Sequence, residues 1–218
     1  MKRLIDRGNS SLLIEMSGMI GNVLNDDTNG NGDGDDCALH IQQDEDFYRM
    51  DFAITSIRMN DGLCNESVMS EWDLSVYPNL KELTVGDDCI RYMRSVVLSG
   101  FACLEKVAIG CNCGASAAGG RFELAHCGQL RSVRIGSDSC VEWGEFVLKD
   151  CSLVAEVSIG DGSFVVCVQA VFESNGRAAD ERLDLPELNQ LKIGREVFKG
   201  NEDKDSSFVM KGDCGGEQ

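Results

Sequence analysis

LKELTVG, at Leu80–Gly86, is one of six copies of the phrase L-x-x-V-x-I-G, and this repetition decides the fold. The closing residue is Gly, or once Asn, and it recurs at intervals of 26, 24, 26, 24 and 34 residues. The copies are ITSIRMN (Ile54–Asn60), LKELTVG (Leu80–Gly86), LEKVAIG (Leu104–Gly110), LRSVRIG (Leu130–Gly136), VAEVSIG (Val154–Gly160) and LNQLKIG (Leu188–Gly194). A period in the twenties is typical of stacked units, none of which can bury its apolar face alone.

Each phrase alternates as a short β-strand does, with Leu83 and Val85 on one face and Glu82 and Thr84 on the other. A second apolar patch of period two follows each closing residue by 10 to 14 positions. These patches are Trp72-x-Leu74, Val96-x-Leu98, Phe122-x-Leu124, Phe146-x-Leu148, Ala170-x-Phe172 and Phe208-x-Met210. The sequence therefore predicts a β-rich solenoid of about six coils, in which equivalent strands stack in parallel into two sheets. A turn of helix in DDCIRYMRS or REVFKGNED stays open, although Val, Ile and Phe favour strands.

The closing Gly allows either a sharp turn at positive φ or a close approach between backbones. Two copies depart from the regular phrase. The third contains the Gly/Ala-rich stretch Cys111–Gly120, which predicts a flexible loop, and the fifth has about ten extra residues near Asn175–Asp184. Both stretches are expected to bulge from one edge of the stack.

Eleven cysteines are present, and several occupy repeat positions that other copies fill with large hydrophobic residues. Such thiols are expected to be reduced and buried as small hydrophobes. The Cys111-x-Cys113 pair lacks a second pair at zinc spacing, so no metal site is predicted there. The equivalences are Cys64 and Cys140 with Ile90, Phe164 and Phe198, and Cys127 and Cys151 with Phe101.

The 218-residue chain carries a formal net charge of −17, which argues against nucleic acid or an anionic membrane as its main partner. No apolar stretch reaches the length of a membrane-spanning helix, so no membrane insertion is expected. Asp6, Arg7 and Glu15 interrupt the N-terminal region where a secretory signal would need an apolar core. A cytoplasmic protein with reduced thiols is the expectation.

Residues 1–50 lack a clear copy of the phrase and are expected to cap the repeats of 51–214, which a short tail at 215–218 follows. Within the cap, Asp26–Cys37 is an acidic linker rich in Gly, Asn and Asp. Asp27, Asn29 and Asn31 match the start of a calcium loop, but its twelfth position is Ala38 instead of Glu. The preferred interpretation is a solvated linker with no metal, and these three residues are a weak calcium-loop candidate.

The repeats resemble the BspA-like leucine-rich repeats of protists and some bacteria. The six phrases carry the resemblance, together with the extensions GDDCI at Gly86 and GDGSF at Gly160 and the F-x-L patches before each next copy. The resemblance covers roughly Asp51 to Gly212. It implies a leucine-rich-repeat-like, right-handed stack and a role in binding proteins or surfaces.

The sequence contains no nucleophile elbow, phosphate loop or zinc signature, so a non-enzyme without cofactors is expected. The preferred function is a non-catalytic, monomeric leucine-rich repeat scaffold that binds a protein partner. An adhesion-type repeat protein of the cell surface is the alternative. A hydrolase using His126 and Cys127 is a remote one.

The predicted binding face is formed by the outward residues of the six phrase strands, which hold four basic and two acidic side chains. On so acidic a chain this face suits an acidic or polar partner. Equally, the alternating charges could serve only to stabilise neighbouring strands. The outward positions of the second strands include Val97, Val147, Val171 and Val209, an apolar stripe that is a second possible interface. The candidate binding residues are Arg58, Glu82, Lys106, Arg134, Glu156 and Lys192.

Overall fold

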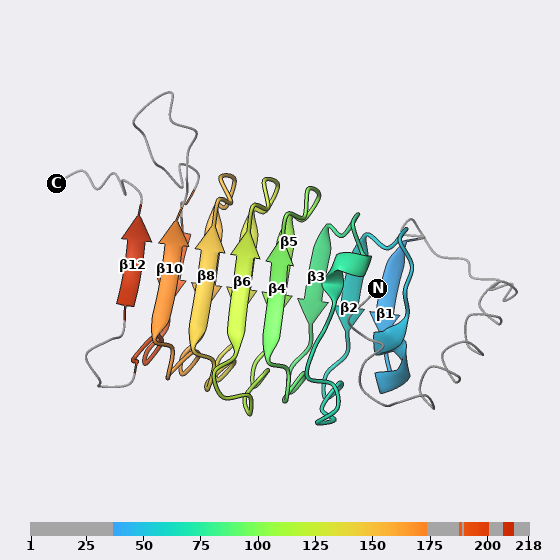
Figure 1. Cartoon of the computed structure of the whole chain (residues 1–218), viewed down its shortest axis with the longest axis horizontal. Coiled ribbons are helices and arrows are strands. Elements are labelled where there is room, and N and C mark those ends of the chain that lie inside the picture. The colour runs from blue at the N-terminus through green and yellow to red at the C-terminus, as the bar shows by residue number, and fades with distance from the viewer. Residues whose placement is uncertain (1–36, 174–187, 189, 201–206, 212–218) are drawn as a thin grey trace, which may run out of the picture. The chain divides into compact units, whose positions relative to one another are not determined.

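The structure is a computed structural model that describes residues 37–173, 188, 190–200 and 207–211. All of them belong to one compact unit, Asp36–Gln218. Its described strands form two parallel sheets of seven and five strands, and strand-bearing coils stack one on another as a β-solenoid (Figure 1). The predicted fold class is confirmed.

The first sheet contains the six phrase strands in sequence order, as predicted, with one further strand before them. Neighbours are parallel and in register, so that Leu83 pairs with Ile57 on one side and Val107 on the other. The sheet order is β1 (Ala38–Ile41), β2 (Ser56–Met59), β3 (Glu82–Val85), β5 (Lys106–Ile109), β7 (Ser132–Ile135), β9 (Glu156–Ile159) and β11 (Gln190–Ile193).

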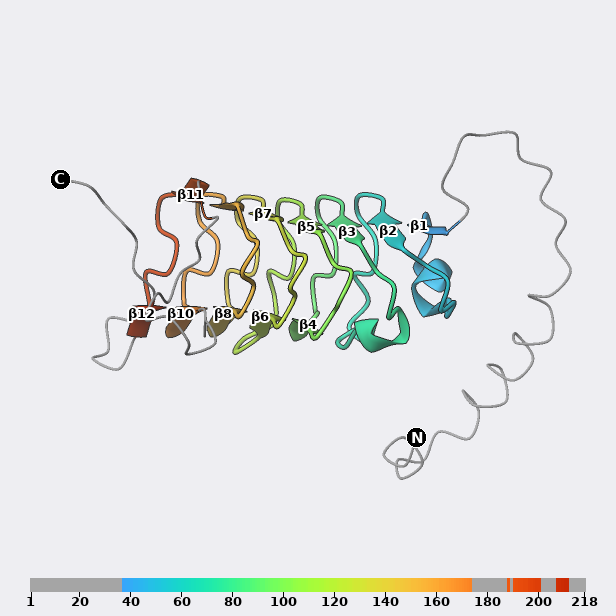
Figure 2. The same ribbon diagram turned by 90° about the horizontal axis from the view of Figure 1, so that it is seen from above.

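The second sheet is built from the second apolar patch of each coil, again in parallel register. Its order is β12 (Ser207–Lys211), β10 (Gln169–Glu173), β8 (Glu145–Lys149), β6 (Arg121–Ala125) and β4 (Ser95–Ser99). Seen from above, the two sheets form opposite walls of the stack, with the connecting corners between them (Figure 2).

Inward side chains from both walls fill one continuous core. Ile135 and Val133 of β7 are 3% and 0% exposed, as the alternation of the phrase requires. Aromatic rings stack from coil to coil, and the Phe122 and Phe146 rings lie 5.5 Å apart at an interplanar angle of 7°. Like residues thus pack on like residues along the stack, which explains why the phrase must repeat.

The second strand predicted around Trp72-x-Leu74 is wrong. That patch forms the 3-10 helix η2 (Leu74–Val76), although Trp72 and Leu74 are buried as expected. The Asp73 carboxylate accepts hydrogen bonds from the Ser75 backbone N–H at 3.0 Å and from the Ser75 hydroxyl at 2.5 Å. This local side-chain bonding competes with the ladder of a strand, and the coil turns there instead.

Strand β1 lies in the segment that we assigned to the cap. It pairs with β2 in register, and its Leu39 and Ile41 are buried. The 3-10 helix η1 (Asp44–Tyr48) follows it, with Phe47 buried against Trp72 at a ring distance of 5.0 Å. The Asp44 carboxylate accepts the Cys64 backbone N–H at 2.7 Å, which ties this segment to the coil of β2.

The stretch Cys111–Gly120, which we predicted to be a flexible, bulging loop, forms a corner of its coil that packs in part against the core. Cys113 and Ala117 are buried within it. A Cβ on Gly114 or Gly120 would lie 2.9 or 2.7 Å from the indole of Trp143, so these glycines make room for that ring. The second predicted bulge, Asn175–Asp184, lies outside the described residues.

Candidate binding face

The first-sheet face is the set of outward side chains of β2, β3, β5, β7, β9 and β11. In-register pairing arranges them in two rows that cross the strands, and Ser56 at the start of the first row is buried. The row nearer the start of each strand is Ser56, Glu82, Lys106, Ser132, Glu156 and Gln190, and the second row is Arg58, Thr84, Ala108, Arg134, Ser158 and Lys192.

All six predicted binding residues lie on the first-sheet face. Arg58, Arg134 and Lys192 are exposed, whereas Glu82, Lys106 and Glu156 are half-buried. The outward orientation of these residues is therefore confirmed, and their inward neighbours form the core.

One ion pair forms between side chains of the first-sheet face. The Arg134 guanidinium donates from Nη2 to both carboxylate oxygens of Glu156, at 2.9 and 3.2 Å. The hydrogen bond to Arg134 lowers the pKa of Glu156, and the nearby charges of Arg134 and Lys192 act in the same direction. The same hydrogen bond raises the pKa of Arg134. Both side chains are solvent-accessible, so the pair contributes little to stability.

The other charged residues predicted on this face have no ion-pair partner among the described residues. Glu82 and Lys106 occupy in-register positions on β3 and β5, yet no salt bridge within 4.0 Å joins them among the described residues. In the same described part of the chain, Arg58 has no carboxylate partner within that distance either. These side chains keep their hydrogen-bonding capacity for another molecule.

The glycine corner borders the first-sheet face where the strands end. None of the closing glycines at 86, 110, 136, 160 and 194 has a positive φ, so close backbone approach is their role. A Cβ on Gly136 would lie 2.6 Å from the Gly110 carbonyl carbon and 2.6 Å from the Cys111 nitrogen. The Gly136 N–H donates to the Ile109 carbonyl at 2.9 Å, which holds the two coils at that separation.

A ladder of thiols and hydroxyls, which the sequence analysis missed, lies three residues beyond the closing residues Gly86, Gly110, Gly136 and Gly160. Each side chain donates to the carbonyl of the closing residue one coil earlier. The Ser139 hydroxyl also accepts the Cys113 N–H at 3.1 Å. The recurrence of Cys or Ser at this position in four successive copies was the available signal. The donor–acceptor pairs are Cys89–Asn60 at 3.1 Å, Cys113–Gly86 at 3.1 Å, Ser139–Gly110 at 2.7 Å and Ser163–Gly136 at 2.8 Å.

The predicted core cysteines are free and buried, which confirms that prediction for Cys127, Cys140 and Cys151. Burial raises the pKa of Cys140 well above its ordinary value. Cys127 and Cys151 occupy equivalent corners of adjacent coils, and the neighbouring Cys127 thiol, together with burial, holds the pKa of Cys151 far above its usual range.

His126 and Cys127, the residues of the hydrolase alternative, lie in very different surroundings. The His126 side chain is 60% exposed, and its Nδ1 lies 3.2 Å from the Asp150 carboxylate. The Cys127 side chain is fully buried, and its thiol donates to the carbonyls of Leu98 and Ala125 at 3.4 and 3.3 Å. A buried thiol bonded to backbone carbonyls is poorly placed to attack a substrate.

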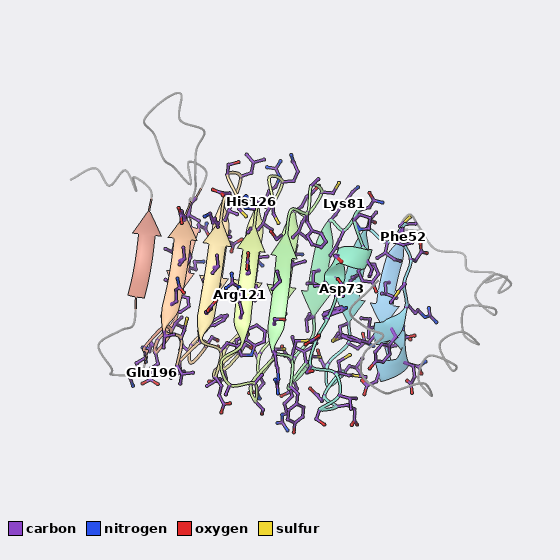
Figure 3. The ribbon with its side chains drawn as sticks, viewed as in Figure 1. Phe52, Asp73, Lys81, Arg121, His126 and Glu196 are labelled. Atoms are coloured by element: carbon purple, nitrogen blue, oxygen red, sulfur yellow. The ribbon has the colours of Figure 1, made fainter. Side chains whose placement is uncertain are left out.

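The second-sheet face consists of the outward side chains of β4, β6, β8 and β10. Val97 is 39% exposed, and Val147 and Val171 are half-buried, so the predicted valine stripe does point outward in these strands. Arg121 crosses it and bridges the carboxylates of Glu123 and Glu145. Figure 3 shows Arg121 in the middle of this sheet. Most charges on this face are thus paired within it.

The calcium-loop candidate Asp27, Asn29 and Asn31 lies outside the described residues. Across residues 37–173 and the described pieces after them, no group of three or more His, Cys, Asp or Glu side chains is arranged to hold a metal ion. The same residues contain no helix with the length and apolarity that a bilayer crossing requires.

Comparisons with known proteins give no indication of function, so the proposal below is based on the two-sheet geometry. No protein-family model, no curated protein and no solved structure matches this chain.

Proposed function

We propose that this protein is a non-catalytic, leucine-rich-repeat-like scaffold that binds a protein partner through its first-sheet face. The BspA-like resemblance of the six phrases supports the repeat type. Free, buried thiols in the described core fit the reducing cytoplasm, which is part of the proposal.

The observation that carries the proposal is the contrast between the two faces. The first-sheet face holds Arg58, Lys106 and Glu82 without ion-pair partners among the described residues, whereas Arg121 of the second-sheet face is committed to two carboxylates. Open polar groups on a rigid sheet are preorganised for a partner, because no internal bond must break and few side chains must be ordered.

Site-specific photo-crosslinking in the 218-residue chain tests the proposal. A photoreactive residue replaces Thr84, a half-buried position on the first-sheet face, and in a matched variant replaces Val97 on the second-sheet face. The expected result is a discrete adduct with one protein from the Thr84 position, which excess unlabelled wild-type chain abolishes. Adducts from Val97 alone, or the same set from both positions, would contradict the proposal.

A further inference from the structure

We infer that the occupant of the first-sheet face is an acidic polypeptide segment in an extended conformation, lying across the strands along the stack. This inference rests on the proposed function and adds the chemistry and geometry of the partner to it. Four observations carry it: the local charge, the spacing of the cations, the short side chains between them, and the carboxylates interleaved with them.

The first-sheet face and the residues that lead into it are basic on a strongly acidic chain. Lys81, Glu105 and Arg131 are exposed and directly precede strands β3, β5 and β7. Counted with the outward residues of the six strands, they give six basic and three acidic side chains, whereas the whole chain carries −17. Opposite charge on the partner would both steer the encounter and suppress competing basic partners.

The spacing of the cations along the stack matches an extended chain. Arg58, Lys106, Arg134 and Lys192 lie on β2, β5, β7 and β11, which are the first, third, fourth and sixth of the six phrase strands. Because adjacent strands lie about 4.8 Å apart, these cations span about 24 Å. An extended peptide advances about 3.3 Å per residue, so about eight residues cover all four.

The surface between the cations is formed by short side chains. Thr84, Ala108 and Ser158 lie between the long side chains of the second row, and all three are half-buried. Short side chains let a partner backbone approach the sheet without displacing protein atoms.

Carboxylates at the glycine corner fix which side of the face the segment uses. Asp61, Asp87 and Asp161 directly follow closing residues, and each accepts the backbone N–H one coil later, for example Asp87 from Cys111 at 2.7 Å. These acidic groups repel an acidic partner. The segment therefore lies on the side of the second row that faces the starts of the strands, between Arg58, Arg134 and Lys192 of that row and Lys81, Lys106 and Arg131.

The interleaved carboxylates favour a polypeptide over a nucleic acid. Glu82, Glu105 and Glu156 sit among the cations, and a nucleic acid backbone would place closely spaced phosphates against them. A polypeptide can place a carboxylate near each cation and a neutral residue near each glutamate.

Fluorescence anisotropy with labelled, end-capped peptides tests the inference on the 218-residue chain. The probe is an octapeptide of alternating Glu and Gly, compared with a Glu-Gly tetrapeptide, a Lys-Gly octapeptide and an eight-nucleotide single-stranded DNA. We expect the acidic octapeptide to bind most tightly and its affinity to fall as salt rises from about 50 to 500 mM. The double variant Arg58→Ala/Lys106→Ala should weaken its binding about fivefold, since two exposed ion pairs are lost.

The control double variant Arg94→Ala/Lys149→Ala removes the same charge outside the first-sheet face and should change the affinity less than twofold. Equal weakening by both double variants would show that only net charge matters and would overturn the inference. Tighter binding of the oligonucleotide, or equal binding of the tetrapeptide, would also overturn it. If no acidic peptide binds while the Thr84 crosslink still forms, the partner is not acidic and the proposed function stands.

Discussion

Adding one methyl group at Gly136 should force two coils apart. The new Cβ would lie 2.6 Å from both the Gly110 carbonyl carbon and the Cys111 nitrogen, and 2.7 Å from the Gly110 oxygen. Ordinary contacts between such atoms are about 3.5 Å, so a shift of roughly 1 Å is required. All three opposing atoms belong to the backbone, which cannot swing aside as a long side chain can.

The shift would disturb hydrogen bonds on both sides of the coil. Gly136 donates to the Ile109 carbonyl at 2.9 Å, and its own carbonyl accepts the Ser163 hydroxyl at 2.8 Å. Overpacking of this kind costs about 1–3 kcal/mol, and a weakened hydrogen bond adds up to about 1 kcal/mol. The expected loss for Gly136→Ala is therefore about 2–4 kcal/mol, or a fall in Tm of roughly 4–16 °C for a chain of this size.

Gly128→Ala is the matched control, because a Cβ there meets nothing within 4 Å and Gly128 lacks a positive φ. Urea and thermal unfolding of both variants, followed by circular dichroism, measure the difference. If Gly136→Ala is as stable as Gly128→Ala to within about 0.5 kcal/mol, the close coil-to-coil packing at the glycine corner is wrong.

Three further predictions concern the core and its thiols. Ile135→Asp should abolish folding, because it places a carboxylate at a 3%-exposed core position, whereas Arg134→Asp should leave the melting curve nearly unchanged. Equal melting temperatures for the two variants would mean that the strand faces are inverted. Cys113→Ser should preserve the fold, since serine fills the same ladder position in the next coil, and it should reduce alkaline sensitivity. Burial raises the pKa of Cys113 from 9.0 to about 12, so the stability that its neutral thiol contributes is complete below pH 9 and is lost as pH rises toward 12. Urea titrations at pH 8 and 10.5 that show the same loss of unfolding free energy in wild type and variant would refute this. A thiol reagent should modify exposed Cys111 well before buried Cys127, and equal rates by peptide mass spectrometry would contradict the packing.

The sequence was sufficient to predict the first sheet because its signal is long-range and regular. Six phrases with period-two alternation allow one register, and that register is observed from Ser56 to Ile193. Strand β1 was missed because ALHI lacks the closing Gly or Asn by which the other copies were recognised. The strand predicted at Trp72-x-Leu74 failed because its apolar residues fit either element, and the Asp73 side chain decided in favour of a 3-10 turn.

The outward residues of the candidate site could also be predicted, because alternation within a strand fixes the face of each side chain. Which of these charged residues form ion pairs with one another could not be predicted. Arg134 reaches Glu156 one strand along and one row across, whereas the in-register charges Glu82 and Lys106 stay apart. Rotamer choice on an open surface decides such contacts, and sequence spacing carries no information about it.

Lysine acetylation footprinting of the wild-type, 218-residue chain tests the central claim most directly. Acetylation rates at Lys106 on the first-sheet face and Lys149 on the second sheet are measured with and without the saturating acidic octapeptide. The account predicts slower acetylation of Lys106 in the presence of the peptide and an unchanged rate at Lys149, whose ammonium lies 3.8 Å from the Glu173 carboxylate. Equal protection of both lysines, or protection of Lys149 alone, would contradict the assignment of the first-sheet face as the binding surface.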